Sequence, residues 1–114
     1  MQPESAAFLW DVREAGVRIA TFTEGLTGES YAADELRKSA VERQLEIIGE
    51  ALNRLRKADP ETAQRVPEIS RIIGLRNILA HGYAVVDDTV VWSAVSERIP
   101  VLLADVTELL AEIE

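Results

Sequence analysis

The sequence contains no cysteine and only one histidine. The absence of cysteine excludes disulfide bonds, thiolate catalysis and thiolate metal sites. With a single histidine, a transition-metal site within one chain is not expected either. No apolar run is long enough to cross a bilayer, and the N-terminus shows no basic stretch followed by a hydrophobic segment. We therefore expect a cytoplasmic protein with no metal, no cofactor and no membrane association.

The chain also lacks the excess of positive charge that is typical of general nucleic-acid binders. Its formal net charge is −8, whereas phosphate binding requires clustered lysine and arginine side chains. Most of the basic residues lie in the middle of the chain, between Arg37 and Arg76, and acidic residues predominate towards both ends. This uneven distribution permits a local basic cleft, and the acidic remainder favours a basic protein partner.

Apolar residues recur at helical spacing along almost the whole chain, and no strand pattern occurs. At 114 residues there is room for one domain, 1–114, with one core. The expected helices are 5–23, 31–58, 68–81, 88–96 and a last helix near 99–113, with a short helical turn at 61–65. This pattern predicts an all-α fold, an up-and-down antiparallel bundle of four to five helices.

Several residues are expected to mark helix ends or the core. Ser5 and Asp88 are candidate N-caps, and Asp59 followed by Pro60 is expected to stop the longest helix. The break at 99–100 marks either an interruption or the first turn of the last helix. The apolar stripes of the long helices, which include Leu36, are interpreted as core.

One stretch, 74–83, brings together a cation, an amide, an imidazole and a phenol at the end of an apolar helix. Asn77 and His81 are four residues apart and share one helix face. Arg76 and His81 lie about 140° apart around the axis. They can still converge on one ligand if the helix end lines a cleft, because the arginine side chain is long. Tyr83 follows His81 by two residues and completes the set.

These side chains suit a specific chemistry. An arginine binds phosphate through a bidentate fork, and a histidine exchanges protons near neutral pH. Without a metal set, Arg76 and His81 indicate attack of a ribose 2′-OH on the neighbouring phosphodiester. Tyr83 can then hydrogen-bond the phosphate, act as a nucleophile or be a modification site. Spacing alone also fits a purely structural interpretation, with His81 favoured by the helix dipole before Gly82 and Arg76 paired with a carboxylate.

A second candidate site is a stripe of glutamates on the longest expected helix: Glu42, Glu46 and Glu50. Such carboxylates can bind magnesium or act as acid and base, but a solvated or salt-bridged face with Arg43 is the interpretation we favour. Glu46 or Glu50 can alternatively orient Arg76 or His81 across the bundle.

The spacing of Arg76, four residues, His81, one residue, Tyr83 resembles the full signature of the HepT-like proteins of the HEPN superfamily. Three further segments continue the likeness in the same order: 42–51, 66–67 and 90–92. The resemblance therefore covers nearly the whole chain. One departure is Glu68, at a position where relatives often carry tryptophan, and it concerns packing more than chemistry.

This resemblance implies a toxin of a type VII-like toxin–antitoxin pair that acts as a metal-independent endoribonuclease on mRNA or tRNA. Arg76 and His81 would be catalytic and Asn77 would support them. The partner would be a minimal nucleotidyltransferase antitoxin that adenylylates Tyr83, placing AMP on its phenol.

The resemblance also implies a homodimer in which the motif helices face each other across the two-fold axis. The chemistry favours a dimer independently, since one group must accept the 2′-OH proton and another must protonate the leaving oxygen. One chain has one histidine, and a dimer brings the motif twice to one cleft.

Two alternatives remain from other functional classes. The chain can be a non-catalytic HEPN module that binds a nucleotidyltransferase partner or a nucleotide, which the acidic balance supports. It can also be a plain helical dimerisation domain, an interpretation that leaves the arginine–histidine–tyrosine set unexplained.

Overall fold

Helices account for nearly all of the regular structure in the computed structural model, which describes residues 1–81 and 86–113. In chain order they are α1 (Ser5–Thr23), α2 (Gly28–Ala32), α3 (Glu35–Ala58), α4 (Pro60–Ala63), α5 (Ile69–Ala80), α6 (Asp88–Ser93), the π-helical turn η1 (Ala94–Arg98) and α7 (Ile99–Ala111). No strand occurs within these two ranges. The predicted all-α class is confirmed.

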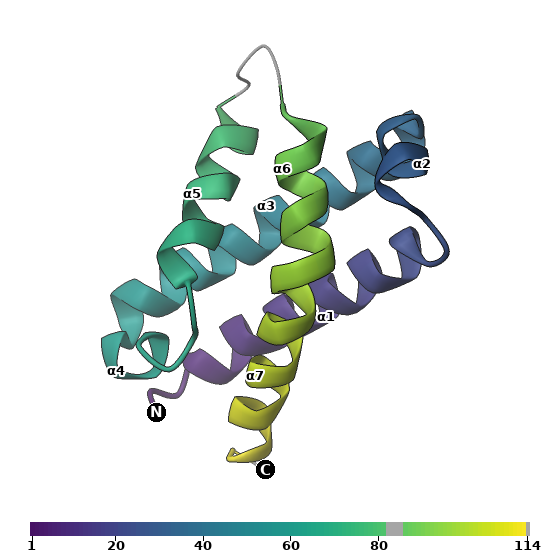
Figure 1. The fold of residues 1–114 in the computed structure, drawn as a ribbon. Coiled ribbons are helices and arrows are strands. Elements are labelled where there is room, and N and C mark those ends of the chain that lie inside the picture. The colour runs from purple at the N-terminus through teal and green to yellow at the C-terminus, as the bar shows by residue number, and fades with distance from the viewer. Residues whose placement is uncertain (82–85, 114) are drawn as a thin grey trace.

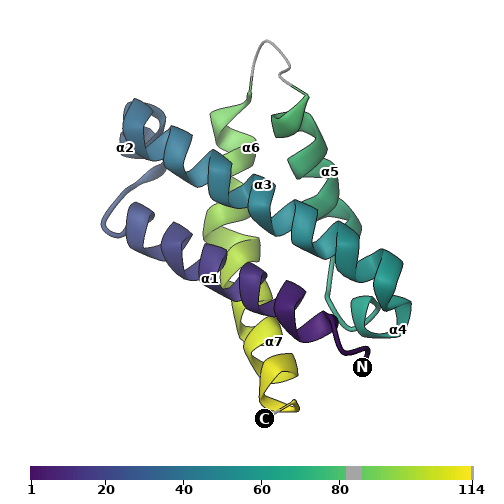
Figure 2. The ribbon, with the colours of Figure 1, turned by 180° about the vertical axis from the view of Figure 1, so that it is seen from behind.

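The helices form two layers. α1 and α3 run antiparallel and side by side in one layer (Figure 1). α5 belongs to the other layer and packs against α3. α6, η1 and α7 follow one another as a single column, and α7 crosses α1. Seen from behind, α1 and α3 lie in front of α5 and this column (Figure 2). The core lies between the layers, and its fully buried side chains include Leu9, Ile19, Leu45, Ile48 and Leu52.

The long helix begins later than the sequence predicts. Asp34 caps α3 by accepting a hydrogen bond from the backbone N–H of Arg37 at 3.0 Å, so the expected helix 31–58 is divided into α2 and α3. α2 has its own start, where Thr27 and Ser30 form a reciprocal capping box. Leu36 lies in the first turn of α3, nine residues before the buried Leu45 and hence about 180° from it around the helix axis, and it is 80% exposed. Its predicted place in the buried stripe is wrong.

Asp59 ends α3 and holds three segments together. Its carboxylate accepts hydrogen bonds from the Gln2 backbone N–H (2.9 Å) and the Ser5 hydroxyl (2.7 Å). It also accepts from the Thr62 backbone N–H (3.2 Å) and the Thr62 hydroxyl (2.5 Å), and so caps α4. Ser5 is therefore not an N-cap as predicted, since its hydroxyl donates to Asp59 and the cap position of α1 is Glu4. These hydrogen bonds, led by the one from the Thr62 hydroxyl, hold the pKa of Asp59 far below its usual range.

We expect the Asp59→Asn variant to be less stable than the wild type at neutral pH, and this difference to shrink in acid. The folded-state pKa of Asp59 is depressed below the unfolded value of about 3.9. The stabilisation by the carboxylate is therefore complete above that value and is lost as the pH falls towards the folded-state pKa. Urea unfolding at a series of pH values measures the stability difference between the wild type and Asp59→Asn. Asp11→Asn, which removes an exposed carboxylate, is the control for the change of charge. Parallel pH profiles of wild type and Asp59→Asn would contradict the assignment.

α6 begins one residue away from the predicted cap. Asp87, not Asp88, is the N-cap, because its carboxylate accepts from the backbone N–H of Thr89 at 2.9 Å. Asp88 instead pairs with Lys38 of α3 at 2.9 Å. Pro100 stands in the first turn of α7, where a missing N–H costs no hydrogen bond. Residues 82–85, which follow the predicted motif helix and include Gly82 and Tyr83, lie outside the described ranges.

None of the helices in the described part of the chain combines the length and the apolar character that crossing a membrane requires.

Candidate active site

α5 carries the motif and matches the predicted helix 68–81 to within one residue at each end. Its apolar side chains Ile72, Ile73 and Leu79 are buried against the core. Glu68 precedes it in a left-handed conformation, with φ +57°. At its other end the backbone N–H of His81 donates to the carbonyl of Asn77 at 3.2 Å. The core contacts thus fix which sides of α5 face inward and outward.

α5 crosses α3 very closely at Gly49. A Cβ atom built on Gly49 would lie 2.5 Å from Cγ of Arg76 and 3.5 Å from its Cα, and closer still to its Cβ. Only a residue without a side chain can occupy this point of α3. Gly49 therefore fixes where Arg76 lies along α3 and how closely the two helices approach at that point.

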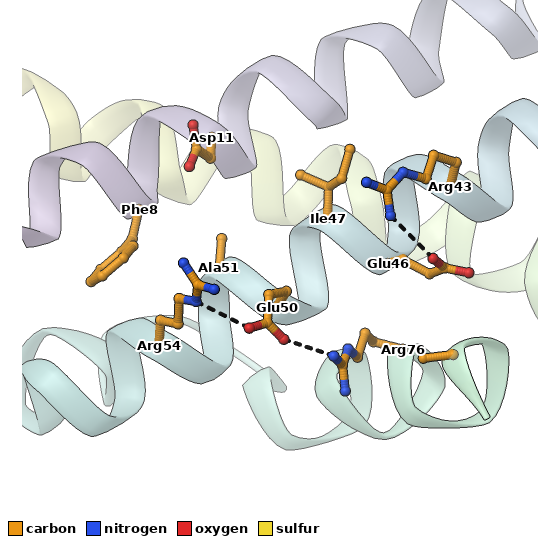
Figure 3. A pocket seen from close by; sticks show the side chains of 10 residues that line it. Phe8, Asp11, Arg43, Glu46, Ile47, Glu50, Ala51, Arg54 and Arg76 are labelled. Atoms are coloured by element: carbon orange, nitrogen blue, oxygen red, sulfur yellow. Dashed lines mark hydrogen bonds and ion pairs between the residues drawn. The ribbon is translucent and has the colours of Figure 1, made fainter.

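The guanidinium of Arg76 is held on two sides. One terminal amino group donates to Oε2 of Glu50 at 2.7 Å, and the other donates to Oδ1 of Asn77 at 3.0 Å. Figure 3 shows Glu50 between Arg76 and Arg54, whose Nε donates to Oε1 of Glu50 at 3.0 Å. The side chain of Arg76 is 26% exposed, so it is positioned by neighbours and still reachable from solvent.

The three glutamates of the stripe have separate surroundings. Glu50 contacts Arg76 and Arg54, whereas Glu46 pairs with Arg43 at 3.3 Å. Glu42 lies near Asp88, and burial followed by the charge of Asp88 raises its pKa. Within residues 1–81 and 86–113, no group of three histidine, aspartate or glutamate side chains is arranged to hold a metal ion. Of the two residues named as candidates for orienting the motif, Glu50 is the one that contacts Arg76.

Arg76 opens onto a pocket of about 230 Å³ between α1, α3 and α5. Equal numbers of basic and acidic side chains line this pocket: Arg43, Arg54 and Arg76 with Asp11, Glu46 and Glu50. Phe8 of α1 supplies an aromatic wall (Figure 3). Sequence reasoning did not single out Arg54 or Phe8. The signal for Arg54 was its spacing from Glu50, because residues four apart on a helix are neighbours.

The other motif residues lie at the outer face of α5. Asn77 and His81 are both exposed, and among the described residues the pocket is bordered by Arg76 and Ala80 of α5. The structure therefore joins Arg76 to Asn77 but places His81 at the helix end, outside the pocket. The predicted modification site Tyr83 lies outside the described residues.

A second surface of α5 is apolar. Ile78 is 45% exposed, and Val90 of α6 is 53% exposed. Together with Leu75 they line a shallow depression between α5 and the α6–η1 column, with Arg71 and Arg98 at its border. α5 thus presents its charged side to α3 and an incompletely covered apolar side away from it.

Comparison with known proteins places this arrangement in a family. The chain belongs to the ribonuclease HepT-like family, which matches residues 12–109. The chain is 38% identical over 99 residues to the "Probable ribonuclease HepT" of Thermococcus cleftensis, an alignment that covers 83% of this chain and 86% of the relative. It is 34% identical over 100 residues to a protein of Methanocaldococcus jannaschii named as a candidate RNase, with 88% and 91% covered. No solved structure matches the chain significantly. The resemblance found in the sequence is confirmed at the level of the family.

Proposed function

We propose that the chain is a metal-independent endoribonuclease, the toxin of a toxin–antitoxin pair, with its active site at the end of α5. The observation that carries this proposal is the guanidinium of Arg76, which Glu50 and Asn77 hold at 2.7 Å and 3.0 Å beside a solvent-accessible pocket. A guanidinium fixed in this way is prepared to receive two oxygens of a phosphodiester. Membership of the ribonuclease HepT-like family supports RNA as the source of that phosphate.

The reaction is a transesterification. A base removes the proton of the ribose 2′-OH, the 2′-oxygen attacks the adjacent phosphorus, and the bond from phosphorus to the 5′-oxygen breaks. An acid protonates that leaving oxygen, which gives a 2′,3′-cyclic phosphate and a 5′-hydroxyl. His81 serves as base or acid, because an imidazole can exchange a proton near neutral pH. Arg76 stabilises the charge that develops on the phosphorane oxygens, and Asn77 holds the guanidinium of Arg76 in place.

A homodimer supplies the second proton-transfer group. Each chain has one histidine, whereas the reaction needs an acid and a base. The exposed apolar side of α5, with Ile78 and Val90, supports a two-fold contact through the motif helices, since such a contact would cover it. Two α5 helices packed in this way place both copies of His81 beside the contact, while each Arg76 stays on the side of α5 that faces Glu50 of its own chain.

Tyr83 is the proposed site of control. Its phenol oxygen would attack the α-phosphorus of ATP on a nucleotidyltransferase antitoxin, forming the tyrosyl–AMP bond and releasing pyrophosphate. The AMP group adds bulk and negative charge two residues after His81, and so repels the RNA phosphate. This proposal rests on the position of Tyr83 in the motif and on the family.

The test is an RNA cleavage assay in EDTA with protein shown by mass to be unmodified. We expect fragments that end in a 2′,3′-cyclic phosphate, identified by end-group analysis, and no gain in rate on adding magnesium. Failure to cleave any RNA with or without magnesium would favour the second candidate, a non-catalytic module that binds a nucleotidyltransferase or a nucleotide. The net charge of −8 is the observation that favours the non-catalytic module.

A further inference from the structure

We propose that the pocket between α1, α3 and α5 binds a second phosphate of the RNA backbone, next to the scissile one, with Arg54 as its main ligand. This inference rests on the proposed function, because it extends the path of the substrate beyond Arg76. It assigns a binding role to residues of α3 and α1 that lie outside the motif.

The geometry of α3 places Arg54 in line with the active site. Arg43, Ile47, Glu50 and Arg54 all line the pocket and follow one another at intervals of four, three and four residues, which keeps them on one helix face. The two arginines at the ends of this row are roughly 16 Å apart along the axis, at about 1.5 Å per residue. The distance between these two arginines is therefore greater than the width of one phosphate group. Arg76 of α5 contacts this row of residues at Glu50.

Glu50 couples the two arginines and leaves the group positively charged. One of its oxygens accepts from Arg76 at 2.7 Å and the other accepts from Arg54 at 3.0 Å. One carboxylate thus serves two guanidinium groups, and the three side chains together carry a net charge of +1. Glu50 engages Arg54 through Nε, so the two terminal amino groups of Arg54 can face a pair of phosphate oxygens. The side chain of Arg54 is 64% exposed and can reach an incoming strand.

The aromatic wall favours single-stranded nucleic acid as the occupant. Phe8 is half-buried and lines the same pocket as Arg54. A cation that binds the backbone beside a ring on which a base can stack is the combination that single-strand binding sites use. Arg43 adds one positive charge to the coupled arginine–glutamate group, and Asp11 and Glu46 add two negative charges, so the formal charges that line the pocket sum to zero. The site therefore suits one phosphate held locally by Arg54 rather than the dense phosphates of a duplex.

The experiment measures binding of a short single-stranded RNA whose riboses are 2′-O-methylated, so that cleavage is blocked. We expect Arg54→Ala to weaken binding roughly 3- to 10-fold, the loss of one charged hydrogen-bonding group at a partly exposed site. The slope of log affinity against log salt should fall in magnitude by about 0.7, as for one phosphate contact on a single strand. Arg54→Lys, which keeps the charge but not the fork, should lose less.

The matched control is Arg56→Ala. Arg56 is an exposed arginine two residues further along α3 that bonds to Asn53, and its removal changes the net charge equally. Equal binding and equal salt slopes for Arg54→Ala and Arg56→Ala would overturn the proposal. Cleavage of unmodified RNA by the wild type is measured in parallel and tests the proposed function separately. Arg54-dependent binding without any cleavage would retain the phosphate site and reject the nuclease, whereas cleavage without Arg54 dependence would do the reverse.

Discussion

The His81→Ala variant is expected to cleave RNA about 10²- to 10⁴-fold more slowly than the wild type, which is the usual contribution of a positioned general acid or base. His81 is exposed at the end of α5 and its described hydrogen bond is made by the backbone N–H. Removing the imidazole therefore leaves the packing of α5 intact, and the thermal midpoint should stay close to that of the wild type. Single-turnover cleavage in EDTA measures the effect on the chemical step.

Arg76 provides the companion to this experiment. Arg76→Lys keeps the positive charge but loses the planar fork that Glu50 and Asn77 hold, so its cleavage rate should lie between those of the wild type and Arg76→Ala. Arg56→Ala controls for the loss of one positive charge. Cleavage at the wild-type rate by His81→Ala would remove this residue from the mechanism, and with it the reason for bringing two histidines together in a dimer.

Much of the fold follows from local patterns that the sequence carries openly. α1 begins and ends at the predicted residues, 5 and 23, and α5 deviates by one residue at each end, because apolar spacing continues up to clear stop signals. The division between α2 and α3 was not predictable in this way. Residues 31–34 are compatible with one continuous helix, and the break arises because Asp34 caps the backbone of Arg37. A choice between continuing a helix and capping a new one depends on single hydrogen bonds rather than on periodicity.

In the candidate site, too, some residues could be predicted from the sequence and others could not. Side-chain type and spacing were sufficient to name Arg76, Asn77 and His81 as candidates. They were not sufficient to decide between Glu46 and Glu50 as the neighbour of Arg76, because both lie on the same stripe of α3. The crossing point of α3 and α5 makes that choice, and Gly49 sets the crossing point. A lone glycine inside a strongly helical segment was the available signal, since it costs helix stability and therefore usually has a packing reason.

The Gly49→Ala variant is expected to lose both stability and activity. The new Cβ would overlap the Cβ of Arg76 and lie 2.5 Å from its Cγ. The Cβ of Arg76 is fixed by the backbone, so no change of rotamer relieves the overlap and α5 must move away from α3. Such overpacking destabilises a fold by about 1–3 kcal/mol, despite the gain of roughly 0.5–1 kcal/mol that alanine brings to a helix. A displacement of Arg76 by about an ångström should slow cleavage by roughly 10²-fold.

Urea unfolding and the EDTA cleavage assay measure the two losses, with Gly16→Ala as the matched control. Gly16 is also a buried helical glycine, but a Cβ there would contact the Leu103 side chain no closer than 3.3 Å, at Cδ1. The stability of Gly16→Ala should therefore change by less than about 1 kcal/mol. A double-mutant cycle isolates the cause. Arg76→Ala keeps the Cβ and should not rescue the stability of Gly49→Ala, whereas Arg76→Gly removes the clash and should. Equal coupling of Gly49→Ala to both substitutions would show that the helices are not held apart by this one atom, and that α5 is positioned by its buried apolar residues instead.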